Sequence, residues 1–217
     1  NRCYHADFLY TDRGNEKKAI SSHVSNQNDS LMDTDQEDLM STSSASKNNG
    51  SRNAVKMQER ETMKIGLEED AVEGVVAVLT RALADTQVVY VKTLNIHWNI
   101  VGPNFYSVHK LLDEQYNMLK DAGDEIAERI RSYGASAIGS MKEFLANTNL
   151  EEKEGNGSVQ IDVLNELIAD HETIVRKLRE GIDQCSDTYE DEGAADLLTA
   201  HLQKHQEMSW MLRSFLR

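Results

Sequence analysis

Residues 104–134 read NFYSVHKLLDEQYNMLKDAGDEIAERIRSYG, and the fold is inferred most directly from this stretch. Its apolar residues recur three, four or seven positions apart, which predicts an amphipathic helix. Asn104 can cap the start of that helix with its side chain, and Gly134 marks its end. The apolar stripe consists of Phe105, Val108, Leu112, Leu119, Ala122, Ile126 and Ile130. A helix with one such face must bury it against other helices.

Three further segments show the same spacing, and the first runs from about Leu67 to just before Gly102-Pro103. The next follows a loose connection through Gly155-Asn156-Gly157, and the last runs from about Glu192 to the end. Their stripes are Val72, Val76, Leu79, Leu83, Tyr90 and Leu94; Ile161, Leu164, Ile168, Val175, Leu178 and Ile182; and Leu198, Leu202, Met208, Leu212 and Phe215. The longest connection has room for a short helix around Met141–Ala146. We therefore predict an all-α four-helix bundle with a short extra helix between the second and third helices.

Composition supports a helical protein, because 217 residues include one proline and only 12 glycines. The sequence has no unbroken apolar run of 18 residues and no signal-peptide core, so we expect a soluble, cytoplasmic protein without membrane association. The two cysteines, Cys3 and Cys185, form no C-x-x-C pair. That excludes a disulfide scaffold or a zinc-thiolate site and fits a reducing compartment.

Charge and complexity divide the chain at about residue 62. Residues 1–62 carry 8 basic and 10 acidic groups and include the Ser/Asn-rich run Ser41–Asn53. We interpret them as a disordered N-terminal arm or a processing segment. Residues 63–217 carry 15 basic and 27 acidic groups, a net charge of −12. A domain this acidic repels nucleic acid and attracts cations.

The chemistry-bearing residues lie on one line of the second predicted helix. His109, Asp113, Asp124 and Glu128 are separated by steps of 4, 11 and 4 residues. At ~100° per residue these steps turn the helix by only about 40°, 20° and 40°. The line lies about 100° from the apolar stripe, so it faces sideways out of the bundle. With His97 from the first helix, these imidazoles and carboxylates suit iron, manganese or zinc.

The spacing along the helix indicates a site shared between subunits. Asp113 and Asp124 are 11 residues apart, which is roughly 16 Å at ~1.5 Å per residue. One helix cannot bring both to one metal, because ligand bonds are about 2 Å long. An antiparallel partner helix, related by a two-fold axis near Met118–Leu119, would place the His109/Asp113 pair of one subunit opposite the Asp124/Glu128 pair of the other. We therefore expect two equivalent sites per dimer and none in a monomer.

The same residues resemble the signatures of the Dps family, the miniferritins that protect DNA in starved cells. The first signature is similar to His97-Trp98-Asn99, Gly102, Asn104-Phe105, His109 and Leu112-Asp113. The second is similar to Asp124-Glu125-Ile126-Ala127-Glu128-Arg129, and the C-terminal residues Ala195–Leu198 and Trp210–Leu212 also match. The resemblance covers about residues 67–217, and the spacing of the family's ferroxidase ligands is kept without a departure.

This resemblance implies a ferritin-like bundle assembled from two-fold dimers into a homo-dodecameric shell. Family members bind Fe(II) at the dimer interface, oxidise it preferentially with hydrogen peroxide and store ferric mineral inside. The implied catalytic and metal ligands are His97, His109 and Asp113 of one subunit and Asp124 and Glu128 of its mate. Glu128 is the implied bridging or strongest ligand. Trp98 would lie beside the site and quench radicals, and Zn²⁺ or Mn²⁺ would compete with iron.

Two other functions compete with this interpretation. Ordinary ferritins and bacterioferritins use a Glu-x-x-His pair within the bundle. His97, His109, His171, His201 and His205 all lack a glutamate three positions earlier, so that class is excluded. The alternative is a DNA-binding, nucleoid-compacting protein in which the iron site is secondary. Its only candidate segment is Lys47–Arg60, with a net charge of +3. Twelve such tails acting together could still bind DNA.

Two weaker metal sites stay open. His201 and His205 are four residues apart on the last predicted helix and could bind a divalent ion, although such pairs are more often surface or packing residues. Cys3, His5 and His23 have ligand chemistry without a recognisable spacing.

Overall fold

The computed structural model describes residues 64–154 and 160–217. Regular structure in these residues is helical throughout: α1 (Glu69–Asn99), α2 (Phe105–Ser132), α3 (Met141–Asn147), α4 (Gln160–Asp183), the π-helical turn η1 (Gln184–Thr188) and α5 (Glu192–Ser214). The all-α bundle with a short extra helix in the long connection is confirmed. The predicted arm of residues 1–62 and the turn at residues 155–157 lie outside the described residues.

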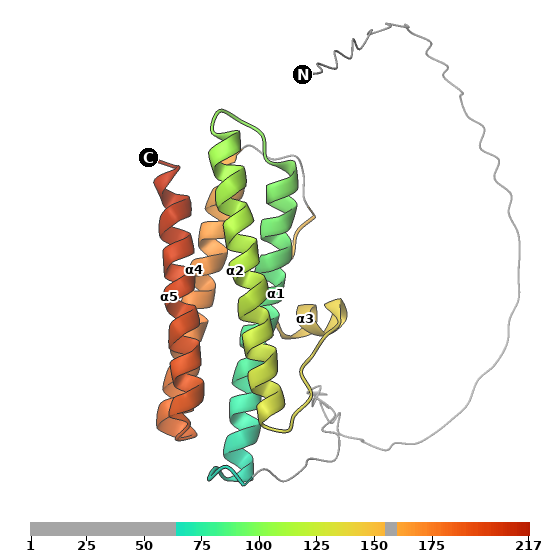
Figure 1. Cartoon of the computed structure of the whole chain (residues 1–217), viewed down its shortest axis with the longest axis vertical. Helices are drawn as coiled ribbons and strands as arrows, with labels where there is room; N and C mark the ends of the chain where they lie inside the picture. The colour runs from blue at the N-terminus through green and yellow to red at the C-terminus, as the bar shows by residue number, and fades with distance from the viewer. Residues whose placement is uncertain (1–63, 155–159) are drawn as a thin grey trace, which may run out of the picture. The chain divides into compact units, whose positions relative to one another are not determined.

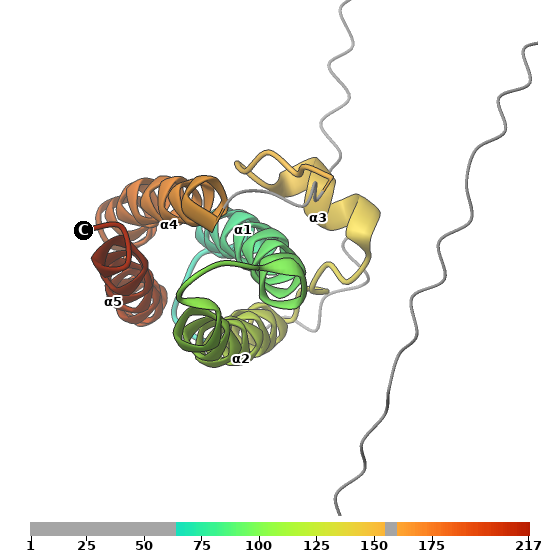
Figure 2. The same ribbon diagram turned by 90° about the horizontal axis from the view of Figure 1, so that it is seen from above.

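Two antiparallel helix pairs make up the bundle (Figure 1). α1 lies against α2, α4 lies against α5, and α1 also contacts α4, which joins the two pairs. The short α3 packs on the outer side of α1, away from α5 (Figure 2). α3 begins at Ser140, whose side chain accepts a hydrogen bond from the Glu143 backbone N–H in a capping box. The α1–α2 pair therefore has one side that α4 and α5 do not cover.

The predicted apolar stripes supply most of the core. The largest fully buried side chains are Leu79, Leu83, Leu112, Leu119, Ile126, Ile130, Leu164, Leu167, Ile174, Leu198, Met208 and Leu212. Phe105 and Ile161 depart from the prediction, since they are 44% and 50% exposed. Each lies in the first turn of its helix, where the facing helix no longer covers the stripe. α1 is long and apolar enough to cross a membrane, but 67% of its apolar window is buried, as in a core helix.

Local boundaries follow the sequence with one exception. α2 ends where predicted, because Gly134 adopts a φ of +75° that L side chains rarely take. Asn104 occupies the position before α2, but its side chain makes no capping hydrogen bond, so the predicted cap is wrong. Its backbone, at φ −100° and ψ 21°, is not in the extended conformation that capping residues adopt.

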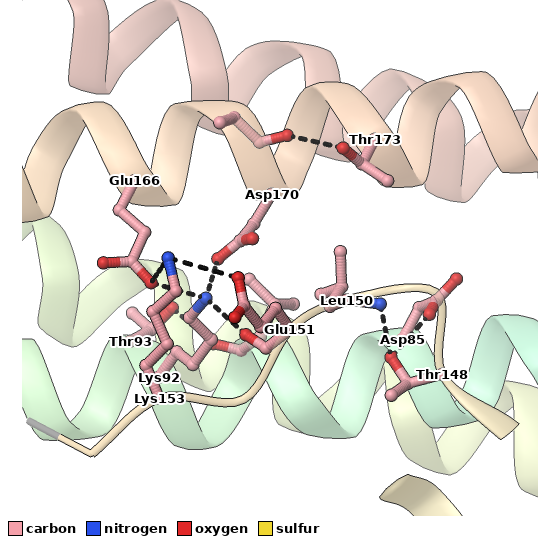
Figure 3. A network of polar contacts seen from close by, with 12 residues as sticks. Asp85, Lys92, Thr93, Thr148, Leu150, Glu151, Lys153, Glu166, Asp170 and Thr173 are labelled. Carbon is pink, nitrogen blue, oxygen red and sulfur yellow. Dashed lines mark hydrogen bonds and ion pairs between the residues drawn. The ribbon is translucent and has the colours of Figure 1, made fainter. Parts of the chain in front are cut away.

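Two buried charged residues of α1 hold the connection that follows α3 (Figure 3). Asp85 accepts hydrogen bonds from the Thr148 hydroxyl and from the backbone and side-chain nitrogens of Asn149. Lys92 donates to the Glu151 carbonyl and pairs with Asp170 of α4 at 2.6 Å. Because both charges are buried and fully engaged, they lock residues 148–151 onto α1. The position of α3 on the outer side of α1 is thereby fixed.

Candidate metal centre

The α1–α2 turn brings together the first two predicted ligands. His97 lies in the last turn of α1 and His109 in the second turn of α2. The chain reverses through Gly102, whose φ of +138° favours glycine, followed by Pro103. The two imidazole rings stack with their centroids 3.9 Å apart and their planes 15° from parallel. Residues twelve positions apart in sequence thus form one pair.

Reciprocal hydrogen bonds orient this pair. His97 Nδ1 lies 3.0 Å from the His109 carbonyl oxygen, and His109 Nδ1 lies 2.9 Å from the His97 carbonyl oxygen. A carbonyl oxygen can only accept, so each Nδ1 carries a proton and donates it. In the neutral ring the Nε2 atom then has a free lone pair. Metal-binding histidines are commonly oriented in this way, by a hydrogen bond from the other ring nitrogen to a carbonyl.

Asp113 follows one turn after His109 on the same face of α2. Its Oδ1 atom accepts a hydrogen bond of 2.6 Å from the hydroxyl of Tyr116. That hydrogen bond lowers the pKa of Asp113, with smaller contributions from Lys110 and the two histidines, and the same bond raises the pKa of Tyr116. Asp113 is therefore a carboxylate near neutral pH, next to the two imidazoles.

Sequence reasoning missed Tyr116 as a member of this group. Its ring meets the His97 ring edge-on, with centroids 5.2 Å apart and planes at 70°, and Tyr90 packs on it at 6.4 Å. The signal was present in the spacing, because residues three apart on a helix, such as Asp113 and Tyr116, are neighbours on its surface.

The second predicted pair lies further along the same helix. Asp124 and Glu128 are exposed on α2 and make no hydrogen bond or ion pair with any other described residue. By helix rise, at ~1.5 Å per residue, Asp124 is roughly 16 Å and Glu128 roughly 22 Å from Asp113. Within residues 64–154 and 160–217 of one chain, no three His, Cys, Asp or Glu side chains are grouped so as to hold a metal. One chain thus carries two separate sets of ligand-type side chains.

The remaining predicted residues have different surroundings. Trp98, next to His97, is 70% exposed. His201 and His205 are buried in the core, not at the surface. His205 Nδ1 lies 2.8 Å from Nδ1 of the buried His171, and His201 Nε2 lies 3.5 Å from the Glu125 carboxylate. Burial lowers the pKa of His171 and of His201 to about 4 and that of His205 well below its usual value.

Known proteins are similar to the chain in both sequence and structure. The family model for the ferritin-like domain matches residues 76–217. A low temperature-induced protein of Nostoc sp. is 41% identical over 71% of this chain and 86% of its own. The DNA protection during starvation protein of Brevibacillus brevis is 35% identical over 65% and 94%. The Dps protein of Vibrio cholerae, described as a member of a superfamily of ferritin-like diiron-carboxylate proteins, superposes with a TM-score of 0.66 at 27% identity, covering 72% and 97%. The chain belongs to the Dps family of ferritin-like proteins.

Proposed function

We propose that this protein is a ferroxidase and iron-storage protein. It binds Fe(II) at sites shared between two subunits, oxidises it preferentially with hydrogen peroxide and stores the ferric product in a hollow homo-oligomeric shell. The observation that supports this function most strongly is the stacked His97/His109 pair, with both Nδ1 atoms hydrogen-bonded to carbonyl oxygens and both Nε2 atoms left as ligands. Membership in a family of iron-storage and DNA-protection proteins supports the same conclusion.

The shared site follows from the separation of the two ligand sets on α2. His97, His109 and Asp113 form one set, and Asp124 and Glu128 form the other. The side of the α1–α2 pair that α4 and α5 leave uncovered is available to a second copy of the chain. An antiparallel α2 from that copy brings its acidic set to the histidine set of the first. Each dimer then has two complete sites.

The donor set suits ferrous iron as the substrate. Imidazole nitrogens and carboxylate oxygens without thiolate bind iron, with zinc and manganese as competitors. Two Fe(II) ions supply the two electrons that, with two protons from solvent, reduce one hydrogen peroxide to two waters, and each iron becomes Fe(III). Because both electrons arrive together, no hydroxyl radical is released. The net charge of −12 on residues 63–217 attracts the cation to the assembly.

Protection of DNA follows indirectly from this chemistry, because the reaction consumes the Fe(II) and the peroxide that together produce hydroxyl radicals. We place the protein in the cytoplasm, where its relatives named for DNA protection would act. Direct DNA binding stays a separate hypothesis, since its candidate segment Lys47–Arg60 lies outside the described residues.

A complementation experiment tests the shared site. The variants His97→Ala/His109→Ala and Asp124→Ala/Glu128→Ala are prepared separately and also co-expressed as full chains. Anaerobic Fe(II) loading is followed by peroxide addition, and light scattering reports the assembly. Each variant alone should lose the fast oxidation phase. Random pairing should restore about a quarter of the sites, because each mixed dimer has one intact site.

A matched control is Asp196→Ala/Glu207→Ala, which removes two exposed carboxylates, also 11 residues apart, from α5 instead of α2. This variant should oxidise iron at the wild-type rate. If mixing the two ligand variants restores no fast phase although mixed shells form, the site is not shared between subunits. If the wild type oxidises Fe(II) no faster than buffer, the ferroxidase function itself is wrong.

A further inference from the structure

We propose that Tyr116 is a positioning residue for the iron site: its hydroxyl holds Asp113 so that Oδ2 is the atom that binds the metal. This inference rests on the proposed function. It adds a residue that touches no substrate but sets the orientation of one that does. The interaction that carries it is the 2.6 Å hydrogen bond from the Tyr116 hydroxyl to Asp113 Oδ1.

The bond selects one of the two carboxylate oxygens. A free aspartate on a helix surface rotates between rotamers and offers either oxygen to a ligand. With Oδ1 engaged by a short hydrogen bond, Oδ2 is the oxygen left for a cation. Asp113 is then presented as a single-oxygen ligand in a defined direction. The Asp113 side chain is already ordered in the folded protein, so metal binding does not have to restrict its rotamers again.

The Tyr116 ring contacts two aromatic side chains of α1. Its centroid lies 5.2 Å from that of the His97 imidazole and 6.4 Å from that of the Tyr90 ring, both in edge-on contacts. These contacts restrict the Tyr116 ring and place it directly against the His97 imidazole. Tyr116 therefore connects two ligands from different helices, His97 and Asp113. The hydroxyl and the ring have separable roles, which a substitution by phenylalanine distinguishes.

The test measures metal binding by full-length shells under anaerobic conditions, with Co²⁺ as a spectroscopic probe of the Fe(II) site. Tyr116→Phe keeps the ring and removes the hydroxyl. We expect its Co²⁺ dissociation constant to rise about tenfold, as is typical when a hydrogen-bonding partner of a metal ligand is lost. The visible d–d bands of bound Co²⁺ should shift as well, because the direction of the Asp113 ligand changes. Light scattering and thermal unfolding should match the wild type.

The matched control is Tyr90→Phe, since the Tyr90 hydroxyl donates no hydrogen bond to a described residue and its ring remains in place. It should bind Co²⁺ with wild-type affinity and spectrum. A double-mutant cycle with Asp113→Asn completes the design. If Tyr116 acts through Asp113, adding Tyr116→Phe to Asp113→Asn has no further effect on the affinity.

The outcomes separate this inference from the proposed function. Wild-type affinity and spectrum in Tyr116→Phe, with Asp113→Asn weakened, would overturn the positioning role and leave the iron site standing. Additive effects of the two substitutions would also overturn it. If Asp113→Asn binds Co²⁺ as the wild type does, the ligand assignment that underlies the proposed function fails instead.

Discussion

Two pairs of histidines in this bundle differ in the hydrogen-bond partners of their Nδ1 atoms. His97 and His109, at the end of the α1–α2 pair, are hydrogen-bonded through Nδ1 to backbone carbonyls and keep their Nε2 atoms free. His171 and His205, in the core between α4 and α5, bond to each other through their Nδ1 atoms. The first arrangement leaves one nitrogen of each ring without a hydrogen-bond partner among the described residues, whereas the second lies among fully buried rings. The partner of each Nδ1 atom, rather than the residue type, decides between binding and packing.

The largest expected effect is a loss of folding stability in acid, and it comes from the buried histidines of the core, which include His201. Burial holds the pKa of His171 and of His201 at about 4, against a usual 6.5. These histidines stay neutral in the folded state while the unfolded chain takes up protons below pH 6.5. Stability is therefore fully present above pH 6.5 and is lost as the pH falls toward 4, by about 3 kcal/mol for each histidine.

Urea unfolding of the full-length protein between pH 4 and 7 measures this loss. The variant His171→Leu/His205→Leu removes two histidines whose pKa values are lowered by burial, so its stability should fall less steeply with pH. This variant keeps His201 and the two charged residues that face it, Glu125 and Lys204. The part of the acid sensitivity that comes from His201 should therefore remain. Identical slopes for variant and wild type would show that these imidazoles are not what makes the fold acid-sensitive.

The second prediction is that a substitution in the His97/His109 pair affects iron oxidation and not stability. His109→Gln removes a ligand nitrogen from a half-buried position and should slow peroxide-driven Fe(II) oxidation by at least about 100-fold. Its free energy of unfolding should change by less than about 1 kcal/mol. Stopped-flow oxidation and urea unfolding on the same sample test both parts. A normal oxidation rate in this variant would show that His109 has no part in iron oxidation, and the contrast with the buried His171/His205 pair would fail.

The third prediction concerns the core pair alone. His205→Leu leaves His171 Nδ1 without its partner in a site that is closed to water. An unsatisfied buried polar atom of this kind costs about 2 kcal/mol. The loss should be seen in urea unfolding at pH 7, while the initial oxidation rate remains at the wild-type value. A reduced rate in shells that assemble normally would connect the core pair to the iron site.

The smallest effect is expected for Trp98, which follows His97 in sequence but faces solvent. Trp98→Phe should change the free energy of unfolding by less than about 0.5 kcal/mol and leave Co²⁺ affinity unchanged. Calorimetry measures both quantities. A large change in affinity would show that Trp98 contacts the site in the assembled shell.

Most of the fold could be predicted because helical periodicity is a local property of the chain. The α2 stripe from Val108 to Ile130 is buried as predicted, and α2 ends at Gly134 for a stereochemical reason that is visible in the sequence. The same periodicity predicts Phe105 and Ile161 in the core, yet they are half-exposed. Periodicity states which face is apolar, but not how far along the helix a neighbour covers it.

The sequence by itself determined the line of histidine and carboxylate side chains on α2, and it predicts that a metal site built from them needs a second subunit, since both follow from residue chemistry and helix rise. Only the tertiary structure decided which nitrogen of His97 and His109 is free, that Tyr116 holds Asp113, and that His205 lies in the core. These features depend on atoms of two different helices, or on a backbone carbonyl twelve residues away. Such partners are set by how helices pack, and spacing within one helix does not specify them.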